Sequence, residues 1–471
     1  MKKLTGILLV ICMLLSVISL AACSAGSGMN NSSMDSSGGS GGYGGGYGKP
    51  GLNGSMGSEK GDGFMEDTMG DSDAMAPEMP DDSVSEGVSE GESGEGADKD
   101  TPVPDEKPVT LPAGMITAGA WNDNTYYSAW LDLFKQGINQ NGKFYNYTNP
   151  SYSWGFNSLE RIKVHVSDGE AVAGASVVAS DSQGNVLFKA VTDAEGNAYL
   201  FTDANEGTVT VTSGEGSATA QFTAEERDLT VTLDASGDKL NVIEIMLVVD
   251  VTGSMGDEIS FLKAELADVI NRIAENDSET VIKLAMLFYR DTDDRVPFDY
   301  YDFTDVTVGD GLSTMKKALN KQYAEGGGDY PEAVDQALDI AVNQQWSTGA
   351  TTKIIFHVLD APAHEGDQYA TKLVNATKTA AEKGIRICPI ICSGAMDSTE
   401  YTMREAAIYT GGTFIFVTDD SGIGGSHHDP QLPNVTVELL NSLMVRLVKG
   451  YHTGDFAPPV YWKEDPSLNN K

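Results

Sequence analysis

Cysteine is scarce in this sequence, with four residues among 471, and two of these, Cys12 and Cys23, lie near the N-terminus. So low a count excludes a fold stabilised by a disulfide framework. The other two, Cys388 and Cys392, lie in the apolar stretch RICPIICSG, which predicts a buried strand. Residues four apart on a strand exceed the separation of about 7 Å that a disulfide allows between Cα atoms. We therefore expect two buried free thiols and a fold that relies on its apolar core.

Basic residues are also few. The chain has 31 lysines and arginines against 69 aspartates and glutamates, for a net charge of −38. This balance excludes nucleic acid as an expected partner, because the phosphates would be repelled. It suits a surface-exposed protein that binds divalent cations, and the length allows two or three domains.

Catalytic patterns are missing as well. Ser260 and Lys263 match the Ser-x-x-Lys of penicillin-binding enzymes, but no Ser-Asp-Asn or Lys-Thr-Gly follows them. His357 and His364 do not have zinc-protease spacing. Because no nucleophile–base pair is evident either, we predict that the protein is not an enzyme.

Two polar loops carry metal-ligand side chains without a recognisable ligand pattern. They hold His427, His428 and Asp429 in SGIGGSHHDP, and Asp291, Asp293 and Asp294 in RDTDD. The second lacks the glycine and terminal glutamate of an EF-hand loop. We interpret both as solvated loops, with metal binding as the alternative.

The N-terminus carries a targeting segment. Lys2 and Lys3 precede an apolar run from Leu4 to Leu20, which is marginal in length for a membrane span. The following Leu-Ala-Ala-Cys23 resembles the lipobox of bacterial lipoproteins, and this resemblance implies cleavage before Cys23 and lipidation of its sulfur. We therefore predict a signal peptide over 1–23 and an extracytoplasmic protein anchored by lipid to the bacterial membrane. An uncleaved anchor helix and an ordinary secretory signal are the alternatives, and both also export the chain.

Residues 24–112 are rich in glycine, serine and acidic residues and almost free of aliphatic side chains. Such a segment cannot bury enough apolar surface to offset the entropy lost on ordering. We predict a disordered tether whose ends lie on the order of 50 Å apart.

Aromatic residues gather in the next segment, 113–158, which we predict to be a helical lead-in. Trp130 and Phe134 lie four apart, as expected for one face of a short helix that packs on the following domain. A carbohydrate-stacking surface is the alternative interpretation, supported only by the aromatic content.

Residues 159–236 show short alternating strands separated by glycine and aspartate turns. Turn spacing of about 8–12 residues predicts an antiparallel β-sandwich. The stretch from VAGASVV to NAYLF resembles transthyretin-like modules related to the regulatory domain of carboxypeptidases. Asp181 and Asp193 fit turn positions, and we assign no site here.

Strands and helices alternate over residues 240–452, which predicts a doubly wound, Rossmann-like α/β domain with a parallel sheet. Expected strands lie at 243–249, 282–288, 353–359, 386–391 and 413–417. Expected helices lie at 257–274, 312–323, 331–344, 369–383, 399–410 and 435–448. The strand over 281–289 is alternatively an antiparallel edge, and 453–471 is a C-terminal tail.

Three loops of this domain carry oxygen ligands at the ends of buried elements. The strand in IMLVVDVTGSM breaks into a loop with Asp250, Thr252 and Ser254. The segment GGGDYPEAVDQAL places Glu332 before a helix, and KIIFHVLDAPAH ends a strand at Asp360. Open α/β sheets bind ligands at the carboxyl ends of their strands, and oxygen ligands suit a hard cation. The simpler alternative for Asp250 and Thr252 is a helix N-cap.

Together these loops resemble the metal-ion-dependent adhesion site of the von Willebrand factor type A family, in the form found in integrin β chains. The resemblance implies that Asp250, Thr252, Ser254, Glu332 and Asp360 hold Mg²⁺, with Mn²⁺ or Ca²⁺ as alternatives. It also implies that displacement of the last helix is linked to the metal site.

The same resemblance implies a second metal site at Asp257 and Glu258, which alternatively are acids that complement a helix dipole. Asp329 is expected either to orient Glu332 or to bind a neighbouring cation.

Two functions follow. The first is a cell-surface lipoprotein that binds an extracellular protein or glycan, whose carboxylate completes the coordination of the metal. The second is a structural or assembly component of the cell envelope, in which the metal only stabilises the domain.

Overall fold

The computed structural model describes residues 112–234, 239–274 and 280–470. The predicted signal peptide with Cys23 lies outside the described residues, and so does the tether apart from residue 112. Both stay predictions. Among the helices that the structure describes, none is long and apolar enough to cross a membrane.

The largest sheet has eight strands in the order β11-β10-β9-β12-β13-β14-β1-β15. Five adjacent strands run parallel: β10 (Val281–Tyr289), β9 (Lys239–Asp250), β12 (Ala350–Leu359), β13 (Ile385–Ile391) and β14 (Phe414–Val417). Antiparallel pairings add the outer strands: β11 (Phe298–Asp305) on β10, β1 (Thr117–Trp121) on β14, and β15 (Glu438–Leu439) on β1. The sheet is therefore mixed, not parallel throughout.

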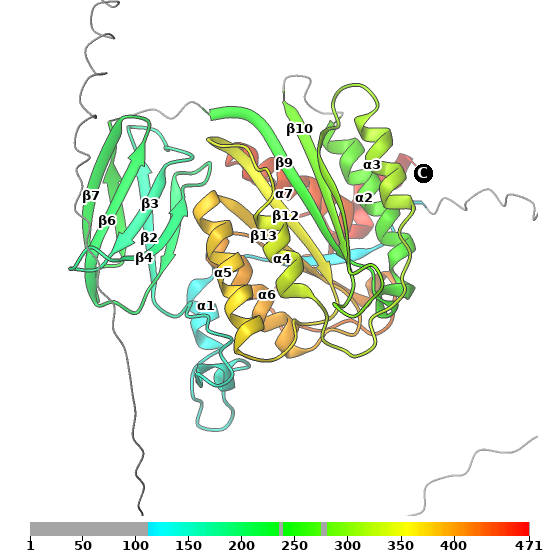
Figure 1. Cartoon of the computed structure of the whole chain (residues 1–471), viewed down its shortest axis with the longest axis horizontal. Helices are drawn as coiled ribbons and strands as arrows, with labels where there is room; N and C mark the ends of the chain where they lie inside the picture. Colours follow the sequence, from blue (N-terminus) through cyan, green and yellow to red (C-terminus); the bar gives the residue numbers. More distant parts are fainter. Residues whose placement is uncertain (1–111, 235–238, 275–279, 471) are drawn as a thin grey trace, which may run out of the picture. The chain divides into compact units, whose positions relative to one another are not determined.

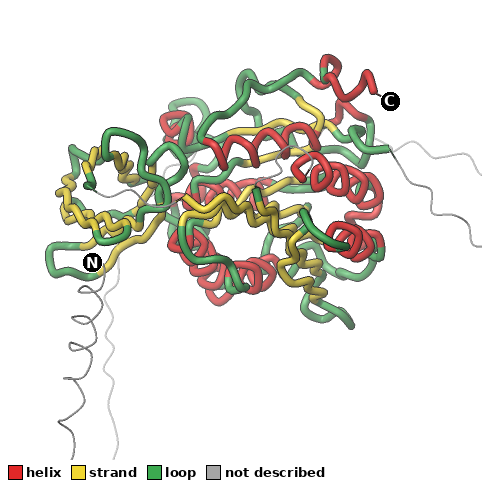
Figure 2. The backbone as a smooth tube through the Cα atoms, turned by 90° about the horizontal axis from the view of Figure 1, so that it is seen from above, coloured by secondary structure: helices red, strands yellow, loops and turns green. Residues whose placement is uncertain are grey.

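Helices cover both faces of this sheet (Figures 1 and 2). One face packs against α2 (Ile259–Ala274), α3 (Gly311–Asn320) and α7 (Leu440–Thr453), and the other against α4 (Val334–Val342), α5 (Asp367–Lys383) and α6 (Asp397–Thr410). Successive strand residues point to opposite faces, so Ile245 and Leu247 join the first core while Met246 and Val248 join the second. The predicted α/β fold is confirmed.

The edge of the sheet differs from the prediction. The strand over 281–289 is not an antiparallel edge, because β10 pairs in parallel with β9 along its whole length. The antiparallel edge is β11, which the sequence did not indicate because its residues FDYYDFTD are half-buried and follow no clear alternation. The last helix begins at Leu440 instead of residue 435, since β15 precedes it and pairs with β1.

The lead-in is not the helical segment that we predicted. Its strand β1 lies in the large sheet between β14 and β15, and helix α1 (Tyr127–Asp132) has only six residues. Trp130 is fully buried, and its ring meets Phe134 edge-on at 5.0 Å between centroids, so the two predicted partners do pack together. The lead-in is part of the larger domain because its strand pairs with β14, nearly 300 residues further along the chain.

Residues 161–232 form two smaller sheets, of order β5-β2-β8 and β4-β3-β6-β7. Their strands are β2 (Arg161–Ser167), β3 (Ser176–Ser180), β4 (Val186–Val191), β5 (Asn197–Phe201), β6 (Glu206–Ser213), β7 (Gly216–Thr223) and β8 (Asp228–Thr232). The expected antiparallel pairing is wrong for β2 and β8, which run parallel. Turn spacing cannot reveal such a pairing, because it joins strands that are not consecutive. The resemblance to transthyretin-like modules stays a prediction.

Short 3₁₀ turns complete the described chain: η1 (Tyr145–Thr148), η2 (Gly253–Asp257), η3 (Asp419–Ser421), η4 (Trp462–Glu464) and η5 (Pro466–Asn470). Cys388 and Cys392 are both buried and unpaired with each other, as predicted.

Candidate metal centre

The first predicted loop brings its three candidate ligand side chains together at the end of β9. The Oδ1 atom of Asp250 accepts hydrogen bonds from the Thr252 backbone nitrogen at 2.9 Å and from Thr252 Oγ1 at 2.7 Å. Ser254 Oγ lies 3.1 Å from Thr252 Oγ1. The backbone nitrogen of Gly253 donates to the Gly326 oxygen at 3.1 Å, which ties this loop to the second one.

Glycines in the second loop let it approach the first. The residues 326–328 all have positive φ angles, which an L side chain rarely adopts. A Cβ atom on Gly327 would lie 2.8 Å from Glu332 Oε1 and 3.4 Å from Thr252 Cβ, so the side chains of Glu332 and Thr252 converge there. The Glu332 backbone nitrogen donates to the Pro362 oxygen at 3.0 Å, which joins the second loop to the third.

One oxygen of each of three carboxylates is left without a partner. Asp250 Oδ2, Glu332 Oε2 and Asp360 Oδ1 are buried and accept no hydrogen bond from any described residue. A buried carboxylate oxygen without a partner costs free energy unless a cation or a proton compensates it. A cation bound among the three predicted ligand carboxylates would therefore compensate these oxygens.

The electrostatics support this conclusion. Burial, followed by the charge of Asp360, raises the pKa of Asp250 to about 7. Burial and then the charges of Asp250, Asp291 and Asp360 raise the pKa of Glu332 to about 9. Burial raises the pKa of Asp360 to about 6, although a hydrogen bond from Ser254 opposes this shift. Carboxylates and hydroxyls around one point match the oxygen ligands that Mg²⁺ prefers.

The sequence of this region identifies its domain family. Residues 244–419 match the sequence model of the von Willebrand factor A domain. The chain contains a von Willebrand factor A (vWA) domain. All three loops lie within the matched residues, and vWA domains are generally interaction modules, not enzymes.

Two curated relatives are 26% identical to the chain. An ariadne-like RING finger protein of Acanthamoeba polyphaga mimivirus aligns over 232 residues, which is 44% of this chain and 21% of that protein. Alpha-protein kinase vwkA of Dictyostelium discoideum aligns over 129 residues, which is 27% of this chain and 19% of that protein. The chain thus spans about a fifth of the length of these relatives.

Two similar solved structures have low TM-scores. A von Willebrand factor type A protein from Catenulispora acidiphila has a TM-score of 0.29 at 11% identity, covering 64% of this chain and 50% of that chain. The pilus adhesin SpaC from Lactobacillus rhamnosus GG has a TM-score of 0.34 at 10% identity, covering 53% of this chain and 33% of that chain. The domain assignment therefore depends on the family match.

Each acid of the predicted second metal site has protein partners for one of its carboxylate oxygens, whereas Glu258 Oε2 is buried without a partner among the described residues. Glu258 Oε1 accepts from His427 Nε2 at 2.6 Å and from the Ser393 nitrogen at 3.1 Å. Asp257 Oδ2 accepts from the Gly425 nitrogen at 2.6 Å and from Ser393 Oγ at 3.2 Å. A cation at this second site would compete with His427, and the site stays a prediction. Asp329 is exposed, and its role also stays a prediction.

The interpretation of His427 and His428 as residues of a solvated loop is wrong. Their side chains are only 3% and 15% exposed. Burial opposes a charge on His427, but the hydrogen bonds to Glu258 and Asp419 prevail and raise its pKa. The sequence shows two adjacent histidines, but it does not indicate that they contact the distant carboxylates of Glu258 and Glu400.

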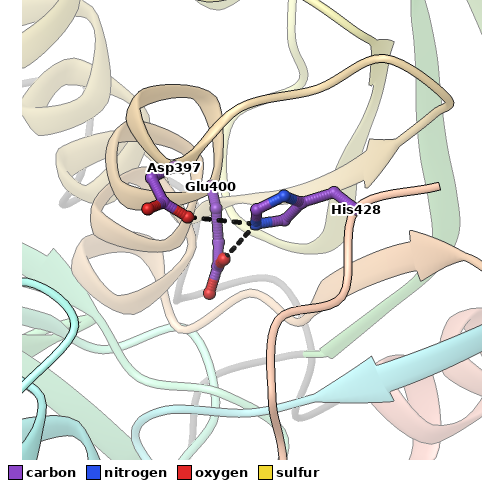
Figure 3. A group of neighbouring side chains, drawn as sticks. All are labelled: Asp397, Glu400 and His428. Carbon is purple, nitrogen blue, oxygen red and sulfur yellow. Dashed lines mark hydrogen bonds and ion pairs between the residues drawn. The ribbon is translucent and has the colours of Figure 1, made fainter. Parts of the chain in front are cut away.

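His428 joins Asp397 and Glu400 of α6 in a group that could hold a metal ion (Figure 3). One ligand atom from each residue lies within 4.8 Å of the others. However, Lys143 Nζ lies 2.5 Å from Glu400 Oε2 and 3.2 Å from both Asp397 Oδ1 and His428 Nε2. The lysine ammonium already pairs with both carboxylates of this group, so a metal would have to displace it.

The interpretation of the acidic loop at 291–294 as solvated is also wrong for two of its residues. Asp291 is 6% exposed, and its Oδ1 lies 2.7 Å from His364 Nε2. Asp294 Oδ2 accepts from the Gly327 backbone nitrogen at 2.9 Å and is thereby hydrogen-bonded to the second candidate loop. Asp293 is exposed, as expected.

Sequence reasoning missed one buried residue beneath the centre. Tyr289 is fully buried, and burial followed by the charge of Asp250 raises its pKa well above the usual range. His357 Nε2 lies 3.1 Å from the Tyr289 hydroxyl, and burial lowers the pKa of His357 to about 3, so this histidine is neutral. Both residues lie in apolar strands, where nothing in the pattern distinguishes them from core positions.

Proposed function

We propose that this chain is a cell-surface lipoprotein whose vWA domain binds an extracellular protein or glycan through a divalent cation. The observation that supports this proposal is the set of three buried carboxylate oxygens without partners on Asp250, Glu332 and Asp360. A bound Mg²⁺ would supply the missing positive charge and an open coordination position for a carboxylate of the partner.

The residues of the centre have separate roles. Thr252 and Ser254 would offer hydroxyl oxygens, and the two hydrogen bonds from Thr252 fix the orientation of the Asp250 carboxylate. Glu332 is held by the backbone contact of its loop with Pro362, so its position depends on the third loop. An arrangement of three loops joined by backbone hydrogen bonds is preorganised, which limits the entropy lost on binding.

The second candidate function is a structural or assembly role in the cell envelope. The raised pKa values of Asp250 and Glu332 favour this structural role, because a cation would stabilise the folded domain even without a partner. Dependence of partner binding on the metal separates the two functions.

We expect the protein to bind acidic ligands on an array of glutamate- and aspartate-containing peptides and uronic- or sialic-acid glycans in millimolar Mg²⁺. This binding should fall by at least tenfold in EDTA and in Asp250→Asn, because both remove the metal bridge. Asp302→Asn, a change of the same charge on β11, should bind like the wild type. Binding that persists in EDTA would rule out the metal-bridged function.

Lipidation of Cys23 has its own test. In a bacterial host, the wild-type chain should incorporate labelled fatty acid and sediment with membranes, because the thiol would carry the lipid. Cys23→Ser should incorporate none and lose membrane attachment, whereas Cys12→Ser should behave like the wild type. Equal labelling of Cys23→Ser and wild type would contradict the lipoprotein prediction.

A further inference from the structure

A groove with a volume of about 450 Å³ borders the metal loops. On one side lie Tyr330 and Pro331, which directly precede Glu332, and Pro362, two residues after Asp360. The lead-in also lines the groove, through Tyr147, Tyr152 and Trp154. A partner bound at the metal centre would therefore also contact this groove.

The aromatic wall of the groove is firmly held. Tyr147 stacks on Tyr401 of α6 with 4.0 Å between ring centroids and an interplanar angle of 10°. The Tyr401 hydroxyl donates to the Ser153 oxygen at 3.0 Å, which fixes the backbone between Tyr152 and Trp154. Tyr152 is 61% exposed, so a large aromatic surface faces solvent at this position.

The groove is negatively charged. Glu365 and Asp367 line it and are exposed, and none of the described residues that line it is basic. The pKa of Tyr147 is raised by burial and then by the negative charges of Asp397, Glu400 and Glu365. Lys143 and Arg404 neutralise Glu400, but Glu365 and Asp367 have no such partner among the lysines and arginines of the described chain.

Aromatic faces beside carboxylates attract a cation more strongly than either group alone. A neutral sugar could stack on the same rings, but it would gain nothing from the negative potential. An arginine or lysine side chain matches both features, and one such chain fits a groove of this volume.

We infer that this groove binds an arginine or lysine side chain of the protein partner. The inference rests on the proposed function, because it assigns the groove to the same partner that reaches the metal. Cation binding in the groove itself needs no metal, so it can be tested separately.

The test uses the full chain in mild detergent with EDTA and the capped peptide acetyl-Gly-Gly-Arg-Gly-Gly-amide, which has no carboxylate to reach a metal. Saturation-transfer NMR suits the weak binding expected of a single side chain. We expect the arginine protons to receive saturation, and the isosteric citrulline peptide to bind at least tenfold more weakly. The double variant Glu365→Gln/Asp367→Asn should weaken binding of the arginine peptide about tenfold, which corresponds to about 1.4 kcal/mol.

Two controls make the outcome decisive. Glu225→Gln/Glu226→Gln removes the same charge from an exposed turn after β7 and should leave binding unchanged, whereas Tyr152→Ala should weaken it severalfold. Equal binding by Glu365→Gln/Asp367→Asn and wild type would overturn the inference, and so would stronger binding of a neutral chitotriose. Because EDTA is present throughout, failure of the metal-dependent function would leave these results unchanged.

Discussion

We expect Asp250→Asn to stabilise the metal-free protein and to abolish its stabilisation by Mg²⁺. In EDTA at pH 8, the variant loses a buried negative charge that burial and Asp360 disfavour, while its amide oxygen still accepts the bonds from Thr252. A pKa raised from 3.8 to about 7 corresponds to a gain on the order of 4 kcal/mol. In a domain of this size, the unfolding midpoint should rise by roughly 5 °C or more.

The sign of the pH dependence follows from the same shifts. Asp250, Glu332 and Asp360 all have pKa values in the folded state above those in the unfolded chain. Their protonated forms stabilise the folded state fully below about pH 4, and this contribution is lost as the pH rises through about 6 to 9. Metal-free protein should therefore become less stable over this range, and Mg²⁺ should reverse most of the loss.

The measurement is thermal unfolding in EDTA and in 10 mM Mg²⁺. If this concentration is about 100 times Kd, Mg²⁺ binding raises the free energy of unfolding by about 2.7 kcal/mol. Glu405→Gln is the matched control, since burial also raises the pKa of Glu405 to about 8 and leaves one of its oxygens without a partner. It should stabilise the protein at pH 8 and keep the full response to Mg²⁺. A Mg²⁺ response in Asp250→Asn as large as that of wild type would refute the assignment of the centre.

The positions of the three candidate loops could be predicted because each directly follows or precedes an apolar element whose type is evident from its sequence. The run IMLVV ending in Asp250, and KIIFHVL ending in Asp360, are buried parallel strands, and parallel strands bring their carboxyl ends to one edge. Position within the sheet then placed both acids together without any knowledge of long-range contacts.

The remaining contacts depend on pairings that local sequence does not encode. Strand β1 is a short run, TAGAW, whose partner β14 lies almost 300 residues away. His427 meets Glu258 across 169 residues, so the histidines looked like part of a solvated loop. The lead-in was assigned to a helix from two aromatic positions, whereas it contacts the domain through the strand β1 and through a buried ion pair between Asp123 and Arg404.

The ion pair between Arg404 and Asp123 is expected to contribute strongly to the stability of the protein. Arg404 is 1% exposed, and its guanidinium donates to both carboxylate oxygens of Asp123, at 2.5 and 2.9 Å, and to Glu400 at 2.9 Å. It also lies over the Trp130 ring at 5.0 Å. We expect Arg404→Met to destabilise the protein by about 3–5 kcal/mol, because it leaves Asp123 buried and unpaired. Urea unfolding measures this loss.

A double substitution distinguishes the stability lost through the uncompensated Asp123 charge from the stability lost through the packing of Arg404. Glu400 keeps Lys143 and His428 as partners, so Asp123 is the group left without compensation in Arg404→Met. Adding Asp123→Asn should therefore recover at least half of the lost stability, whereas Lys189→Met, at an exposed pair with Glu382, should change it by less than about 1 kcal/mol. If the double variant were no more stable than Arg404→Met, the ion pair would not be what fastens the lead-in to α6. Since the same lead-in carries Tyr147, Tyr152 and Trp154, its attachment also decides whether the groove beside the metal centre keeps its shape.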